Sequence, residues 1–156
     1  MKTARTNAVD QEELPGYCIR RLHQIAVAIF LQETEAHGLT PVQYAALSKV
    51  GLTPGVDQRT LARSIGLDTS TVAGVIDRLE ARGLMQRSAS PEDRRVRLLS
   101  LTVAGQDLLT AIEPDMLKAQ QRILAPLRKA ERSEFMRMLQ ALVTANNELS
   151  RAPSEM

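Results

Sequence analysis

The sequence has one cysteine, no tryptophan and few aromatic residues, and these absences limit what the protein can be. A single cysteine excludes an intramolecular disulfide framework and favours the reducing environment of the cytoplasm. No apolar run approaches the ~18 residues that a transmembrane helix requires, so we expect no membrane-spanning segment. Aromatic residues make up 3% of the 156 residues. The sequence therefore predicts one domain with an aliphatic core.

The residue patterns that enzymes use are also missing. The chain has two histidines, His23 and His37, and it contains no H-E-x-x-H motif, metal-spaced cysteines, phosphate-cradling glycine loop or nucleophile elbow. Cys18 and His23 are five residues apart and would not share a helix face. We therefore expect a protein that is not an enzyme and that needs no metal or cofactor.

Lysine is absent from residues 57–105, where every basic residue is arginine. This segment contains eight Arg and six acidic residues, whereas residues 1–56 and 106–156 each contain equal numbers of the two signs. The net charge of +2 therefore arises entirely within it. Guanidinium groups form forked hydrogen bonds to phosphate and guanine, so this segment is a candidate nucleic-acid surface. A solvated charged surface is the alternative.

The order of elements in this segment predicts a helix-turn-helix followed by a wing. Asp57 is a predicted N-cap for the first helix of the pair, and Asp68 or Thr69 for the second, which Gly83 ends. The expected elements are helix 58–65, turn 66–67, helix 69–82, strand 84–88, polar loop 89–95 and strand 96–101.

Further helices precede and follow this unit. One is expected from about residue 12 or 16 to 36, and another begins after the N-cap Thr40. A long helix, 103–124, contains Pro114, which should bend it, and a last helix spans about 130–149. The apolar faces of the first and last two helices are larger than one small monomer can bury, which indicates a dimer. The predicted fold is mainly α: a winged helix-turn-helix with a two-stranded β-wing and terminal dimerisation helices.

The exposed face of the second helix of the pair carries the residues expected to contact DNA. Hydroxyl groups at its N-terminal end suit phosphate or base-edge contacts beside free backbone N–H groups. Gly74 would let the backbone approach the duplex closely, or is a tolerated exposed glycine. Arg78 would reach phosphate or base, or pair with Asp77 or with an acid across the turn. The predicted contact residues on this helix are Thr69, Ser70, Thr71, Gly74 and Arg78.

The loop of the wing carries a second set of candidate contacts. A carboxylate at Asp93 would hold the Arg95 guanidinium extended and aimed at a narrow minor groove, where the negative potential favours arginine. Arg94 and Arg97 would add phosphate contacts. A solvated charged hairpin is the alternative, but a position directly after a helix-turn-helix favours DNA binding.

Three motifs in succession resemble the MarR family of winged-helix regulators. Residues 39–44 (LTPVQY) are similar to its L-T-x-x-Q-[YF] motif, residues 77–84 (DRLEARGL) to D-R-L-E-x-x-G-L, and residues 93–105 (DRRVRLLSLTVAG) to D-x-R…L-T-x-x-G. The segment from Leu14 resembles the start of the family's first helix, so the resemblance covers nearly the whole chain. Gly74 departs from the pattern, because many relatives carry a basic or larger residue there. This argues against a side-chain base contact at that position.

The resemblance implies a homodimer that binds a pseudo-palindromic operator in double-stranded DNA. Residues 41–101 would form the DNA-binding lobe, and residues 13–38 and 103–150 the dimerisation helices. Together they would make a single domain, 13–156, behind a flexible arm, 1–12. Half-sites about one DNA turn apart and an affinity that falls steeply with salt would follow.

The regulated process and its effector are also implied by the resemblance. The segments 68–84 and 90–99 look most like the branch that represses aromatic-acid and nicotinate degradation. A small anionic aromatic effector, such as a hydroxylated benzene or pyridine carboxylate, would bind between the dimerisation helices and the DNA-binding lobe. It would release a repressor of a catabolic operon.

Candidate effector-binding residues are polar side chains close to apolar surface. Arg20 could bind a carboxylate bidentately, and His23 could hydrogen-bond a ring substituent. Gln24 and Tyr17 lie within about one turn of them, and Tyr44 could come from the following helix. A polar dimer surface is the alternative for Arg20 and His23.

Two other functions compete with an effector-released repressor. Cys18 allows a thiol-based oxidant sensor, because some MarR relatives use a cysteine in the first helix, although the nearby tyrosines of that pattern are mostly missing. A small buried apolar residue is the alternative for Cys18. A DNA-free interaction module is the other competitor, but it would not need an arginine wing.

Overall fold

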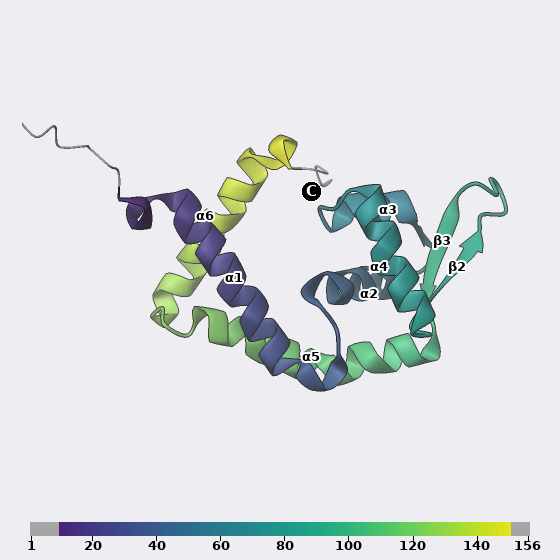
Figure 1. Ribbon diagram of the computed structural model, residues 1–156, viewed down its shortest axis with the longest axis horizontal. Helices are drawn as coiled ribbons and strands as arrows, with labels where there is room; N and C mark the ends of the chain where they lie inside the picture. Colours follow the sequence, from purple (N-terminus) through teal and green to yellow (C-terminus); the bar gives the residue numbers. More distant parts are fainter. Residues whose placement is uncertain (1–9, 151–156) are drawn as a thin grey trace, which may run out of the picture.

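Helices account for most of residues 10–150, the part of the chain that the computed structural model describes (Figure 1). The helices are α1 (Pro15–Glu33), α2 (Pro41–Leu52), α3 (Gln58–Ser64), α4 (Thr69–Ala81), α5 (Val103–Leu124) and α6 (Lys129–Ala145). The strands are β1 (Val56–Asp57), β2 (Met85–Ala89) and β3 (Arg97–Leu101). Three short 3-10 helices are η1 (Gln11–Glu13), η2 (Glu35–His37) and η3 (Asn147–Leu149).

These elements form two lobes that α5 connects. In Figure 1, α2, α3, α4 and the β2–β3 hairpin lie together on one side, and α1 and α6 lie on the other. The long α5 follows a curved path from the hairpin to α6 and contains Pro114. This arrangement is the predicted mainly α, winged helix-turn-helix fold, with terminal helices outside the winged lobe.

Side chains cap the helices where the sequence predicted. The Thr40 hydroxyl accepts from the backbone N–H of Gln43, and the Gln43 side chain accepts from Thr40, which makes a complete capping box on α2. The Asp68 carboxylate caps α4 by accepting from the backbone N–H of Thr71, and the Thr102 hydroxyl caps α5 by accepting from that of Gly105. These caps satisfy backbone donors that have no partner within the helix, so they fix where each helix begins.

Gly83 ends the helix α4, as predicted, in a Schellman motif. Gly83 adopts a left-handed conformation, with φ of 70°. The backbone N–H of Leu84 donates to Leu79 O at 3.0 Å, and that of Gly83 donates to Glu80 O at 2.8 Å. Leu79 and Leu84 both belong to the core, so the motif turns the chain directly from α4 into the hairpin.

Two predicted helix ends are wrong by several residues. The first helix ends at Glu33 rather than residue 36, because the hydroxyl of buried Thr34 donates to Phe30 O at 2.8 Å and the chain tightens into η2. The last helix ends at Ala145 rather than Leu149, because the Asn146 side chain donates to Leu142 O and η3 follows.

The wing also differs from the prediction, because its sheet has three strands. β1 pairs with β3 with Val56 opposite Leu99, and β2 pairs with β3 from Met85 opposite Leu101 to Ala89 opposite Arg97. All pairs are antiparallel, in the order β1-β3-β2. A two-residue strand carries no alternating pattern, so only the pairing partner reveals it. The extra strand ties the base of the wing to the start of α3.

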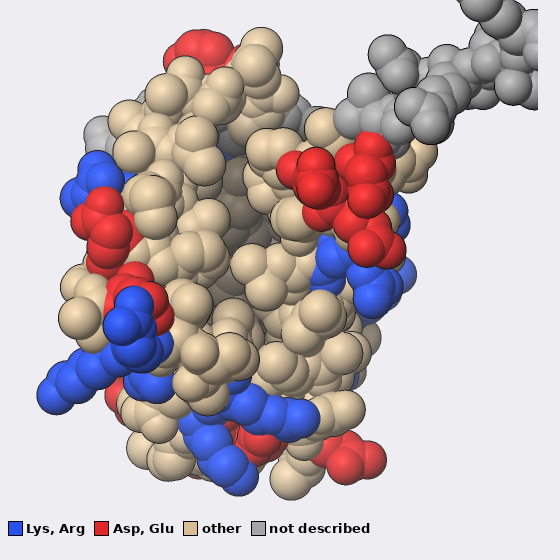
Figure 2. All heavy atoms as spheres, turned by 90° about the vertical axis from the view of Figure 1, so that its left-hand side faces the viewer, with Lys and Arg blue, Asp and Glu red and all other residues tan. Residues whose placement is uncertain are grey.

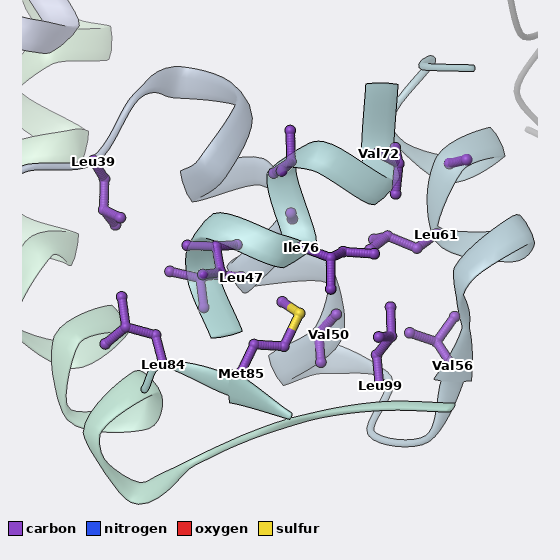
Figure 3. Packing of buried hydrophobic residues seen from close by; sticks show 14 of the residues in the cluster. Leu39, Leu47, Val50, Val56, Leu61, Val72, Ile76, Leu84, Met85 and Leu99 are labelled. Atoms are coloured by element: carbon purple, nitrogen blue, oxygen red, sulfur yellow. The ribbon is translucent and has the colours of Figure 1, made fainter. Parts of the chain in front are cut away.

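The core lies inside the winged lobe (Figure 3). It is aliphatic, as the composition predicted, and its largest fully buried side chains include Leu47, Leu61, Ile76, Leu79, Met85 and Leu99. Phe30 of α1 and Ile112 of α5 extend it, and the Phe30 ring packs against Tyr44 with centroids 5.8 Å apart. No residue of α6 is buried within the single chain. The terminal helices therefore depend on something else to cover their apolar faces.

Gly105 brings the start of α5 against the end of α4. A Cβ at this position would lie 2.0 Å from the backbone oxygen of Leu84. Leu84 cannot move away without cost, because its oxygen accepts from Thr102 N at 3.2 Å and Gly83 O accepts from the Thr102 hydroxyl at 2.6 Å. The Thr102–Gly105 spacing in the sequence is therefore a structural requirement of this junction.

Replacing Gly105 with alanine should destabilise the fold strongly. The added methyl group would collide with backbone rather than with a flexible side chain, so we expect a loss of about 3 kcal/mol, or roughly 6–12 °C in Tm for a chain of this size. Gly74→Ala is the matched control, because a Cβ there meets nothing within 4 Å. Thermal unfolding followed by circular dichroism measures both. Equal melting temperatures for G105A and the parent protein would contradict the packing described.

Helical structure begins inside the segment expected to be an arm. Asp10 caps η1, which starts at Gln11. The rest of the expected arm, residues 1–9, lies outside the described residues. Within residues 10–150, no helix combines the length and the apolar character needed to cross a membrane.

Candidate nucleic-acid interface

The helix α4 turns one face into the core and the other to solvent. Val72, Val75, Ile76 and Leu79 are buried, as their spacing predicted. The predicted contact residues are on the opposite side: Thr69, Ser70, Thr71 and Arg78 are exposed, and Gly74 is half-buried. The space beside Gly74 is open, which suits close approach of another molecule to the helix backbone.

Asp68 organises the N-terminal end of this face. Its carboxylate accepts hydrogen bonds from the hydroxyls of Ser70 and Thr71, each at 2.6 Å, and from the backbone N–H of Thr71 at 2.9 Å. The hydrogen bond from Ser70, followed in size by that from Thr71, holds the pKa of Asp68 far below its usual range. Both hydroxyl protons are therefore engaged within the protein. Thr69 remains the hydroxyl at this end that can donate to phosphate.

A pair of acidic residues fixes α4 to the wing. Asp77 and Glu80 both form ion pairs with Arg87 of β2, the second with Arg87 Nε 3.0 Å from Glu80 Oε2. Asp77 is thus engaged with the strand and not with Arg78, which was one alternative considered for Arg78. Among the described residues Arg78 has no ion-pair partner, so its guanidinium is available to a ligand.

The wing loop holds Arg95 in the predicted way. Asp93 accepts from Arg95 Nε at 3.1 Å, from Arg95 Nη2 at 3.2 Å and from the Arg95 backbone N–H at 3.0 Å. The Arg95 side chain is nevertheless 91% exposed, and its hydrogen bonds lower the pKa of Asp93. Arg94 and Arg97 are exposed beside it. The loop therefore presents a pre-aligned guanidinium to solvent rather than folding it onto the protein.

A concavity of about 650 Å³ joins the wing to the helix-turn-helix. Arg95 and Arg97 line one side, and Thr69, at the start of α4, lines another. Sequence reasoning missed the third side, which is formed by Arg59 and Arg63 of α3. The available signal was their spacing of four residues, which places both on one helix face. The four arginines make this concavity a candidate binding site for a polyanion.

The candidate effector residues are divided between the lobes. Arg20 lies 5.4 Å from the centre of the Tyr17 ring on α1, with His23 and Gln24 exposed on the same helix. Tyr44 instead lines a cavity of about 280 Å³ between α2 and α5. None of the four α1 residues lines this cavity. A single chain thus brings Tyr17 and Arg20 together but not the whole candidate set.

The structure tests one of the two interpretations of Cys18, its burial as a small apolar residue. It is exposed in the single chain, so the expectation of a small buried residue is wrong there. Its thiol lies 3.4 Å from the backbone oxygen of Glu12, to which it donates.

Comparison with known proteins places the chain among DNA-binding regulators. The model of the MarR family matches residues 39–96. A candidate transcriptional regulatory protein for the hcr operon of Thauera aromatica is 33% identical over 85% of this chain and 81% of its own. The ligand-bound PcaV transcriptional regulator of Streptomyces coelicolor is 35% identical, with a TM-score of 0.83 over 88% of this chain and 97% of that chain. Bordetella bronchiseptica BpsR, whose DNA binding is regulated by 6-hydroxynicotinic acid, is 31% identical, with a TM-score of 0.82 over 86% and 96%.

Proposed function

Because this chain belongs to the MarR family of transcriptional regulators, we propose that it is a homodimeric repressor of a catabolic operon, released by a small aromatic carboxylate. Each subunit would place α4 in the major groove and the wing along the adjacent minor groove of a pseudo-palindromic operator. Its place of action would be the cytoplasm, where the DNA is.

The observation that carries the DNA-binding part is the exposed, pre-aligned Arg95 above a concavity lined by arginines. The concavity is lined by Arg95 and Arg97 of the wing, by Arg59 and Arg63 of α3 and by Thr69 at the N-terminus of α4. These residues would offer phosphate contacts beside the helix that reads the bases. Gly74 and Arg78 lie further along the outward face of that helix. An interaction module without DNA would have no use for this arrangement.

The homodimer rests on apolar surface that one chain leaves open. Figure 2 looks onto the α1 and α6 side of the molecule and shows a largely uncharged face with a hollow at its centre. The exposed apolar residues of these two helices include Ile19, Leu22, Ile25, Met136, Met138, Leu142 and Val143, and Leu14 directly before α1 is exposed too. A second copy would cover them through a two-fold, self-complementary contact.

The effector site would need parts from both lobes. The cavity between α2 and α5 offers the Tyr44 ring and several polar groups, but its one charged side chain is Glu113, an acid. An acid repels a carboxylate, so the base that binds the effector must come from elsewhere. Arg20 and His23 are exposed on α1 and supply a guanidinium and an imidazole. In a homodimer, α1 of the second subunit could bring them to this cavity.

Replacing Arg20 with alanine should separate the effector response from DNA binding. With 6-hydroxynicotinate as the probe, we expect the parent protein to show a rise in Tm and to leave a duplex operator selected from random sequences. The R20A variant should bind the same duplex equally well and require at least ~10-fold more probe, because the carboxylate loses its forked partner.

Arg21→Ala is the matched control, since Arg21 is an exposed neighbour on the same helix. A panel of hydroxylated benzene carboxylates extends the screen. If R20A and R21A respond like the parent protein to a probe that releases DNA, Arg20 does not bind the carboxylate. If no aromatic carboxylate changes Tm or DNA binding, the proposed effector class is wrong.

A further inference from the structure

Two side chains from different helices meet at the short segment His37-Gly38, between α1 and α2. Arg82, which follows the last residue of α4, donates from Nη1 to Gly38 O at 2.7 Å and from Nη2 to His37 O at 3.3 Å. The His37 ring then pairs with Asp115 of α5, with Nε2 2.9 Å from Oδ2. These contacts connect the end of the DNA-reading helix to α5 through two residues.

The guanidinium of Arg82 is well suited to bind the two backbone oxygens of this segment. His37 ends η2, so the backbone oxygens at this point lack helical partners and carry partial negative charge. Gly38 is left-handed, with φ of 63°, and turns the chain there. An arginine fork binds both oxygens at once, which a single ammonium group cannot do with the same geometry. The contact therefore fixes the orientation of the guanidinium relative to this segment as well as the distance between them.

Asp115 lies at a point of α5 that connects the two lobes. Ile112, three residues before it, is fully buried in the core of the winged lobe. Lys118 and Arg122, after it, both pair with Glu33 at the end of α1. Pro114 lies at the boundary and lacks the N–H that would complete the helix there. Asp115 thus lies where α5 passes from one lobe to the other and where it bends most easily.

We propose that Arg82, His37 and Asp115 form a positioning relay that transmits a displacement of α5 to α4. A shift of α5 at Pro114 moves Asp115, the His37 ring follows, and the backbone oxygens that hold Arg82 move with it. The segment that follows α4 also contacts Gly105 and Thr102 at the start of α5. A displacement transmitted by the relay would therefore turn α4 about this second contact. The inference rests on the proposed homodimer, in which the two α4 helices must match two half-sites.

Distances between the two α4 helices test the relay directly. A nitroxide at Ser70→Cys, in a Cys18→Ser background, gives one label per subunit, and double electron–electron resonance measures their separation without DNA. We expect one narrow distribution for this labelled parent. Arg82→Ala and Asp115→Ala should each shift or broaden it by on the order of a few Å. The double variant should change it no more than the larger single change, because both break one relay.

Two further variants separate the relay from general loosening. Arg82→Lys keeps the charge but not the fork, and should lower operator affinity about five-fold with an unchanged Tm. Glu33→Ala removes two other ion pairs between α1 and α5, with Lys118 and Arg122, and should leave the distribution unchanged. Distributions for R82A, R82K and D115A that match the labelled parent would overturn the relay. A labelled parent without any dipolar signal would overturn the homodimer instead.

Discussion

Replacing Leu142 with glutamate is expected to convert the protein into monomers and to abolish tight operator binding. Leu142 is 56% exposed in the single chain and lies on α6, where Met138 and Val143 are also exposed. A carboxylate at this position would have to be buried without a partner in the proposed interface, and the cost of its desolvation opposes association.

The effect on DNA binding should be larger than any single contact could produce. When two linked DNA-binding lobes bind two half-sites, the second lobe binds at a high effective concentration. Separating the subunits should therefore lower the affinity about 100-fold or more. Sedimentation velocity measures the mass, and fluorescence anisotropy with a selected operator measures the affinity.

Val103→Glu is the control for an added surface charge. Val103 is 81% exposed, more than Leu142, but it lies at the start of α5 rather than on α1 or α6. The V103E variant should remain dimeric and bind the operator. If L142E also stays dimeric, the α6 face is not the interface. If it becomes monomeric yet binds as tightly as before, the two half-sites are not read together.

Replacing Arg95 with alanine should lower operator affinity about 10- to 100-fold, while folding and dimerisation remain unchanged. This is the range of one well-placed arginine contact, about 1–3 kcal/mol. Arg95 is almost wholly exposed and, among residues 10–150, is held only by Asp93 of its own loop, so the core does not depend on it. The salt dependence of log affinity should also become less steep, because one counterion fewer is released.

Lys129→Ala is the matched control, since it removes the same charge from an exposed position at the start of α6. A loss of affinity caused by net charge alone would be similar in the two variants. An R95A affinity equal to that of K129A, with matching salt slopes, would count against the wing as a DNA contact. Asp93→Asn should give a smaller loss than R95A, because the guanidinium is kept but is held less firmly.

Local signals in the sequence predicted most of the helices and both long strands. Caps such as Thr40, Asp68 and Thr102 satisfy the first backbone donors of a helix, and their residue types are visible without a structure. The Schellman turn at Gly83 could likewise be predicted, because glycine at that position and an apolar residue after it define the motif.

Other features depend on partners that are distant in the sequence. The strand β1 exists because Val56 and Asp57 pair with residues more than 40 positions away. Arg59 and Arg63 belong to the candidate interface because the fold brings α3 and the wing to the same concavity. The hydrogen bonds between Arg82 and the His37-Gly38 segment have no sequence signature, since any exposed arginine could bind backbone oxygens.

The interface residues divide in the same way. The Asp93–Arg95 pair is local and was predicted with its geometry, because two residues of one short loop must lie close together. The partners of Asp77 were not predictable, since Arg87 lies on another element. The effector residues remain a prediction, because four of the five lie on α1 and meet the α2–α5 cavity only if a second subunit brings them there.

The central claim is that two winged lobes, related by a two-fold axis, bind one duplex together. Hydroxyl-radical footprinting on an operator selected from random duplexes, with the mass of the same complex measured by sedimentation, tests it most directly. We predict two protected segments with inverted sequence, centred about 10 base pairs apart, on a duplex that carries two chains. A single protected segment with one chain bound, or selection that enriches no sequence, would contradict it.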